Sequence, residues 1–172
     1  MTLELCDDPS ELSLAITELA TSSLTLEAAL SRVLAIFGEA SDAIVGEAWV
    51  ELTPGTLTSI SRWTAAGAVA ADATRVLVGE GIAGIVYATG TATIVSEESG
   101  SRSLTRERIR SGRAELTHAT GLPLFADGRV IAVLTLGSES EPVPSTDTAE
   151  LVTGLLAPVG PFVGLRLATG DT

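Results

Sequence analysis

Arginine side chains gather in one short stretch of an otherwise acidic chain. Arg102, Arg106, Arg110 and Arg113 follow one another at spacings of four, four and three residues. On a helix these spacings place the side chains on one face, because about 3.6 residues complete a turn. Guanidinium groups bind carboxylate and phosphate through paired hydrogen bonds, so Arg106 and Arg110 are predicted to contact an anionic ligand. The alternative is a solvated face whose arginines pair with neighbouring glutamates: Glu97, Glu98, Glu107 and Glu115.

Other groups that could take part in chemistry are isolated. His118 is the only histidine; it could serve as a base, an axial haem ligand or a polar pocket group, or it could be a structural histidine at the start of a strand. Glu47 and Glu51 lie on the same side of a predicted strand as Trp49. Paired carboxylates can perform acid–base chemistry, but exposed sheet acids are the alternative interpretation. No serine, histidine and aspartate arrangement is legible from the spacing.

The composition excludes several kinds of site. All ten basic residues are arginine, so a lysine Schiff base and a P-loop lysine are excluded. Cys6 is the only cysteine, which excludes an intrachain disulfide and a cysteine-rich zinc site. The net charge of −12 disfavours nucleic acid and anionic membranes as partners. No long apolar window and no basic leader are present, so the predicted location is the cytoplasm.

Hydrophobic periodicity and capping residues predict five helices. Ser10 is the expected cap of the first helix and Thr25 of the second, and Gly90 is the expected left-handed C-cap of the third. Pro158 and Pro161 should kink or divide the last helix. The predicted helices span 11–20, 25–37, 82–89, about 102–115, and about 146–167.

Alternating apolar residues and turn signals predict six strands. Asp127-Gly128 is a typical two-residue hairpin turn, because both positions tolerate positive φ. The predicted strands span 43–52, 57–64, about 74–78, 91–95, 117–126 and 129–137. At 172 residues one domain is expected, with a core over 10–168 and flexible tails at 1–9 and 169–172. Strands joined by hairpins imply an antiparallel sheet with helices packed on its faces.

Two segments in this order resemble the signature of the GAF domain, a small-ligand sensor module. They are Gly79-Glu-Gly-Ile-Ala-Gly-Ile-Val-Tyr-Ala-Thr-Gly-Thr-Ala-Thr-Ile-Val95 and Gly121-Leu-Pro-Leu-Phe-Ala-Asp-Gly-Arg-Val-Ile-Ala-Val-Leu-Thr-Leu-Gly137. Leu24–Leu34 looks like the family's entry helix, and Gly46-Glu-Ala-Trp-Val50 is similar to the first strand of a bacterial signal-transduction subgroup. The resemblance covers roughly residues 10–168.

The resemblance implies an α+β fold with a six-stranded antiparallel sheet in the order 3-2-1-6-5-4. Terminal helices would cover one face, and the pocket helix and segment 96–115 would enclose a small-molecule site on the other. It also implies homodimerisation through the terminal helices and a partner such as a sensor kinase. The expected pocket residues are Trp63, Ile82, Val86, Tyr87, His118, Thr120, Leu122 and Thr135, with Arg106 and Arg110 at the mouth; core packing is the alternative for most of them.

Specialised branches of the family can be compared residue by residue. Free methionine sulfoxide reductases and bilin-binding branches use pocket cysteines, which this chain lacks in the pocket segments. The cyclic-nucleotide signature requires Asn and Lys, and neither occurs. Haem-binding branches need an axial histidine, and the only candidate, His118, stands at the start of a strand and not in the preceding loop. No haem, other tetrapyrrole, cofactor or metal is therefore predicted. The sequence therefore favours a small-molecule sensor, with a ligand-free interaction module and a redox enzyme without the usual cysteines as the alternatives.

Overall fold

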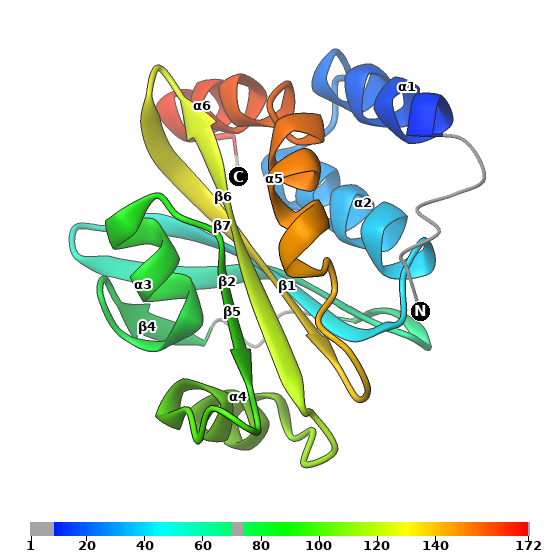
Figure 1. Ribbon diagram of the computed structural model, residues 1–172. Coiled ribbons are helices and arrows are strands. Elements are labelled where there is room, and N and C mark those ends of the chain that lie inside the picture. The colour runs from blue at the N-terminus through cyan, green and yellow to red at the C-terminus, as the bar shows by residue number, and fades with distance from the viewer. Residues whose placement is uncertain (1–8, 70–73, 172) are drawn as a thin grey trace.

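A curved antiparallel sheet with helices on both faces forms the centre of the molecule in the computed structural model, which describes residues 9–69 and 74–171 (Figure 1). The sheet order is β3-β2-β1-β7-β6-β5, and β4 also pairs with β2. If β3 and β4 are taken as one edge, this is the predicted order 3-2-1-6-5-4, so the predicted fold class is confirmed. The strands are β1 (Ala43–Thr53), β2 (Thr56–Thr64), β3 (Gly67–Val69), β4 (Arg75–Leu77), β5 (Thr93–Ser96), β6 (His118–Ala126) and β7 (Arg129–Ser138).

Helices divide unequally between the two faces of this sheet (Figure 1). One face, the helix-layer face, is covered by α1 (Pro9–Ala20), α2 (Leu26–Glu39), α5 (Thr146–Leu155) and α6 (Val159–Thr169). The other, the cavity face, carries α3 (Gly81–Thr89) and α4 (Arg102–Ser111). This is the predicted division into terminal helices on one side and pocket helices on the other.

Local signals set most of the helix ends. Thr25 caps α2 by accepting a hydrogen bond from the Ala28 amide at 3.3 Å, as predicted. Gly90 ends α3 in the left-handed conformation, also as predicted. Two details differ: α1 begins at Pro9, so Ser10 lies inside the helix instead of capping it, and α4 ends at Ser111, before the predicted end at residue 115. Proline suits a first turn because its missing N–H would have no helical partner there.

The hairpin and the C-terminal bend follow the predicted chemistry. Asp127 and Gly128 adopt φ of 51° and 74° between β6 and β7, which confirms the two-residue turn. The predicted last helix divides into α5 and α6, which meet at a bend of 57°. Pro158 precedes α6 and Pro161 lies in its first turn, where neither proline costs a helical hydrogen bond. Strand β3 was not predicted.

A β-bulge in β2 decides which face Trp63 occupies. Trp49 pairs with Ser59 and Ala48 pairs with Ser61, so Ile60 is the extra residue. An extra residue shifts the alternation of side chains between the two faces by one position. Trp63 consequently lies in the helix-layer core, where a Cβ added at Gly38 would be 2.5 Å from its ring. Its expected place in the pocket is therefore corrected.

The chain ends differ in how much the structure describes. Residues 1–8 and 172 of the predicted tails lie outside the described residues. By contrast, Asp171 pairs with Arg166, and its carbonyl accepts a hydrogen bond from the Leu26 amide at 3.4 Å. Within the described chain, no single helix has the length and hydropathy to cross a membrane; α5 and α6 reach them only as a bent pair.

Candidate functional site

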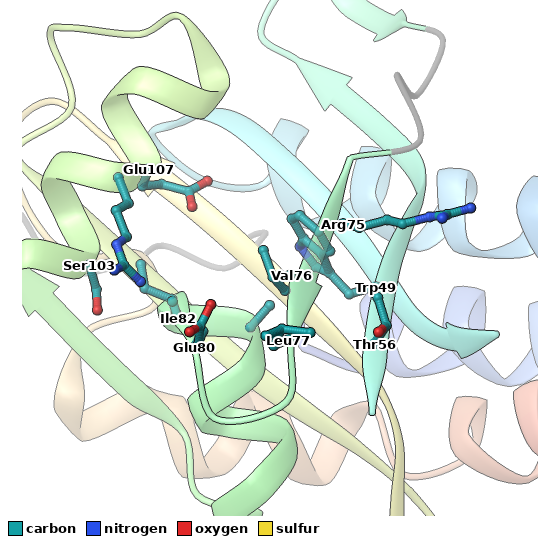
Figure 2. A pocket seen from close by; sticks show the side chains of 12 residues that line it. Trp49, Thr56, Arg75, Val76, Leu77, Glu80, Ile82, Ser103 and Glu107 are labelled. Carbon is teal, nitrogen blue, oxygen red and sulfur yellow. The ribbon is translucent and has the colours of Figure 1, made fainter. Parts of the chain in front are cut away.

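A cavity of about 270 Å³ lies on the cavity face, between α3, α4, β4 and the underlying sheet (Figure 2). Its position follows from the chain path, because β4 leads through a short turn into α3, and α4 lies beside α3. Small ligand sites commonly occupy concave spaces of this kind, although most are larger. The lining residues are Trp49, Thr56, Arg75, Val76, Leu77, Glu80, Gly81, Ile82, Ala83, Ser103, Arg106 and Glu107.

Trp49 forms the aromatic wall of the cavity. Trp49 is only 1% exposed, and its indole Nε1 donates a hydrogen bond to Thr135 Oγ1 at 3.0 Å. That bond satisfies the polar end of the ring and fixes its orientation. Val76 and Ile82 line the same space. The inner part of the cavity therefore offers a rigid apolar surface to a ligand.

Groups of both charges surround the cavity. Arg106 and Arg75 line it together with Glu80 and Glu107. Figure 2 shows the carboxylates of Glu80 and Glu107 directed toward the space between them, whereas Arg75 extends away from both. A ligand would thus meet apolar surface below and charge at the mouth.

The first turn of α3 borders the same space. Gly81, Ile82 and Ala83 line the cavity, and the capping residue Glu80 makes no side-chain hydrogen bond to this turn. Amide groups in the first turn of a helix have no partner within the helix, and the helix dipole makes this end positive. Arg106 and these amides favour an anionic group, while Glu80 and Glu107 favour a cationic one. The arrangement can hold a small polar molecule.

The structure brings part of the predicted site together. Ile82 and Arg106 line the cavity, and Thr135 holds its aromatic wall. Val86 lies on the side of α3 that faces the sheet, where a Cβ added at Gly121 would come within 2.7 Å of its side chain. Tyr87 lines a separate groove beside α6. Arg110 lies in α4, but its side chain falls outside the described part of the structure.

Three predicted pocket residues of β6 do not lie at the cavity. Leu122 belongs to the helix-layer core, and Thr120 shares its face by alternation. His118 lies on that face by the same alternation, and its Nδ1 is 2.9 Å from Thr117 Oγ1. The reason is that Ala119 and Gly121 face α3. Both faces of β6 are apolar, so alternation alone did not identify the cavity face.

Comparison with known protein families agrees with this architecture. A family model described as "GAF domain" matches residues 20–163. The chain belongs to the GAF domain family. A search of curated proteins finds no significant match.

Solved structures with the same GAF fold include GAF domains of larger proteins and enzymes. The GAF domain of a phosphoenolpyruvate-protein phosphotransferase from Coxiella burnetii has a TM-score of 0.76 and 16% identity, over 95% of this chain and 96% of that one. The corresponding Acinetobacter domain has a TM-score of 0.73 and 15% identity, over 94% and 96%. The free methionine-R-sulfoxide reductase of Neisseria meningitidis, solved with its substrate, has a TM-score of 0.63 and 20% identity, over 92% and 87%. At these identities the likeness establishes the fold alone.

Several cavity residues of this GAF domain were missed by sequence reasoning. The sequence correctly predicts Trp49 on the same side of the strand as Glu47 and Glu51, but the interpretation of these glutamates as exposed sheet acids would leave that side in solvent. In the structure Glu47 is 1% exposed and its Oε1 lies 3.3 Å from Arg62 Nε. Arg62 also donates to the Ser111 carbonyl at 2.8 Å, at the end of α4. A buried carboxylate needs such partners, so the interpretation of Glu47 as an exposed acid is corrected.

Glu51 connects the β1–β2 hairpin to α3. Its Oε2 accepts a hydrogen bond from the Tyr87 hydroxyl at 2.8 Å, and its Oε1 accepts one from the Gly55 amide at 2.7 Å. Burial, with the hydrogen bond and negative charge of Glu51 adding to it, raises the pKa of Tyr87 to about 12. The phenol therefore stays protonated at neutral pH and fixes the C-terminal half of α3 to β1.

Proposed function

We propose that this GAF domain is a cytoplasmic sensory module that binds a small, charged molecule in the cavity between α3 and α4. The observation that carries the proposal is the cavity itself, with the Trp49 indole on one side and charged groups at its mouth. Binding would change the packing of α3 and reach the terminal helices through the sheet. A homodimer or a sensor kinase would then receive the signal.

Structural relatives support a ligand-binding role. The reductases from Neisseria meningitidis and Staphylococcus aureus share this fold and were solved in complex with substrate. Others are domains of larger proteins, such as the phosphotransferases. A sensory role for this chain combines the two features: a pocket that accepts a small molecule, and helices that pass the response to another domain or protein.

Native mass spectrometry on freshly purified protein tests the proposal. The expected result is extra mass on the folded chain that disappears on denaturation and gives the mass of the ligand. The Arg106→Gln/Arg110→Gln double variant should lose that mass, whereas Arg129→Gln, an exposed arginine outside the cavity, should retain it. Bare sequence mass for the wild type, together with no ligand-induced shift in melting temperature across a metabolite panel, would count against a sensor.

The two tryptophans give an independent optical test of the same site. Trp49 lines the cavity, whereas Trp63 packs in the helix-layer core. A ligand that enters the cavity should change tryptophan emission in Trp63→Phe, where Trp49 is the remaining tryptophan. The matched variant Trp49→Phe should show little change. Equal changes in both variants would place the ligand elsewhere or indicate a response of the whole domain.

A second candidate function is protein interaction through the terminal helices. Leu14 on α1, Leu151 on α5 and Leu165 on α6 are 60%, 56% and 62% exposed. A contiguous group of such side chains would favour a dimer or a docked partner. Replacing Leu151 with Glu should shift a dimer toward monomer in sedimentation analysis; an unchanged molar mass would exclude α5 from the contact.

Catalysis is a third candidate, because free methionine-R-sulfoxide reductases share the fold. The family resemblance implies that those enzymes use pocket cysteines, and the only cysteine of this chain is Cys6. We therefore propose a non-enzymatic role. Turnover of free methionine sulfoxide by the pure protein with a thiol reductant would overturn this part of the proposal.

A further inference from the structure

Positive charge is concentrated in α4 and the residues that follow it. Residues 102–113 contain five of the ten arginines and only one of the 22 acidic residues. Helix α4 lies at one end of the sheet, far from the terminal helices (Figure 1). Positive charge on this segment therefore stands out against a chain that is strongly negative elsewhere.

The inner side of α4 accounts for its attachment to the domain. Leu104 is 2% exposed and enters the core of the cavity face. Arg108 donates to the Leu116 carbonyl at 2.5 Å and pairs with Glu97 at 3.1 Å. These contacts hold the helix in place. The fold therefore does not depend on the residues of the opposite side.

That opposite side, here called the outer face of α4, consists of Arg102, Arg106 and Ile109. Spacings of four and three residues place them along one side of the helix. Within the described residues, neither arginine forms an ion pair. Ile109 is 78% exposed, the highest value among the exposed large apolar side chains of the described chain. An exposed isoleucine beside unpaired arginines indicates a surface that is complementary to something both acidic and partly apolar.

The charge distribution also limits the size of the partner. At physiological ionic strength, electrostatic interactions are screened over about 8 Å, and a ten-residue helix is about 15 Å long. A short acidic segment on α4 would experience mainly the local positive charge. A long nucleic acid or a flat anionic membrane would extend past α4 and meet the acidic remainder of the chain.

We propose that the outer face of α4 docks a short acidic segment of a partner protein, with one apolar side chain of that segment covering Ile109. Carboxylates of the segment would pair with the guanidinium groups, which bind them through two parallel hydrogen bonds. The apolar contact would supply the desolvated centre that exposed ion pairs lack. Arg106 also lines the cavity, whereas Arg102 and Ile109 do not, so changes at Arg102 and Ile109 test the docking role without altering the cavity lining.

A labelled peptide tests this docking surface directly. The probe is a fluorescein-tagged peptide of five residues, four Glu and one central Leu, whose extended length at about 3.3 Å per residue is close to that of α4. The measurement is fluorescence anisotropy at low and moderate salt. Arg102→Gln combined with Ile109→Ser should weaken binding about tenfold, from the loss of one charge pair and one apolar contact. The control Arg129→Gln with Leu165→Ser removes an exposed arginine and an exposed apolar residue elsewhere and should leave the affinity unchanged.

A modified peptide, added salt and other anionic ligands test the same proposal further. A peptide in which Ser replaces the Leu should bind more weakly to the wild type, and added salt should weaken both peptides. Equal affinity for wild type and the α4 variant, or no binding at millimolar peptide, would overturn it. Tighter binding of single-stranded DNA or of phosphatidylserine vesicles would replace the acidic segment with another partner and also overturn it. The α4 variant leaves the residues that line the cavity unchanged, so failure here leaves the sensor proposal intact.

Discussion

The two faces of the sheet use tryptophan in opposite ways. On the helix-layer face, Trp63 packs so closely on α2 that a Cβ at Gly38 would overlap its ring. On the cavity face, Trp49 is also buried, but it borders the cavity and donates its N–H to Thr135. The helix-layer face is a large apolar core built from four helices. The cavity face has a smaller core and contains the Glu47–Arg62 pair.

This difference indicates that stability and binding are carried by different faces. A large apolar core supplies most of the free energy of folding through burial. The smaller core of the cavity face can tolerate an unfilled cavity and a buried ion pair, because the helix-layer core already stabilises the sheet. Perturbations of equal size should therefore cost more on the helix-layer face.

Matched leucine truncations should show the largest effect. Leu34 of α2 is completely buried in the helix-layer core, and Leu104 of α4 is 2% exposed in the cavity-face core. Leu34→Ala should lower the free energy of unfolding by about 4 kcal/mol, because the surrounding core cannot collapse. Leu104→Ala should cost about 2 kcal/mol, since α4 can move toward the cavity. Urea denaturation measures both, and equal costs would contradict the division between faces.

Two glycines that make close backbone contacts, one on each face, allow a second comparison of the two faces. A Cβ added at Gly160 of α6 would lie 1.7 Å from the Phe125 carbonyl oxygen, and one at Gly84 of α3 would lie 2.3 Å from the Leu77 carbonyl oxygen. Gly160→Ala should destabilise the protein by about 3 kcal/mol through forced displacement of α6. Gly84→Ala should cost less in global stability but increase amide hydrogen exchange in α3 and β4.

Gly154 supplies the control for both glycine variants. It lies in α5 with nothing within 4 Å of an added Cβ, so Gly154→Ala should be neutral or stabilising by about 0.5 kcal/mol. A loss of stability in Gly154→Ala would show that the other effects arise from helix composition and not from close packing.

The fold was predictable because its signals are local. Thr25, Gly90 and the Asp127-Gly128 turn each act through one or two neighbouring residues, and all three behave as predicted. The site was less predictable because it depends on which face a residue occupies. The bulge at Ile60 moves Trp63 to the other face, and no residue type in β2 indicates that a bulge occurs there. Alternation within β6 places Thr120 and Leu122 opposite the cavity.

Removing the buried charge on the cavity face should have a smaller effect than the core truncation at Leu34. Glu47→Gln keeps the size of the side chain but leaves Arg62, which is 15% exposed, without its carboxylate partner. Breaking a buried pair leaves an uncompensated charge, but Arg62 retains the Ser111 carbonyl. The expected loss is about 2 kcal/mol in thermal or urea unfolding. Glu47→Gln/Arg62→Gln should recover part of it; no recovery would show that the charge is not the cause.

Ionisation of Tyr87 should give the smallest effect and the most specific test of how α3 is attached. Tyr87 is the only tyrosine, so phenolate absorbance reports on it alone. The folded pKa of about 12 lies above the ordinary value of 10.0, so folded protein binds the proton more tightly than unfolded protein. This contribution to stability is complete below pH 10 and is lost as pH rises toward 12. Glu51→Gln should lower the folded pKa toward 10 by removing the negative charge. A wild-type titration midpoint near 10 in the folded state, matching that of protein unfolded in denaturant, would contradict the Tyr87–Glu51 contact as the attachment between α3 and the hairpin.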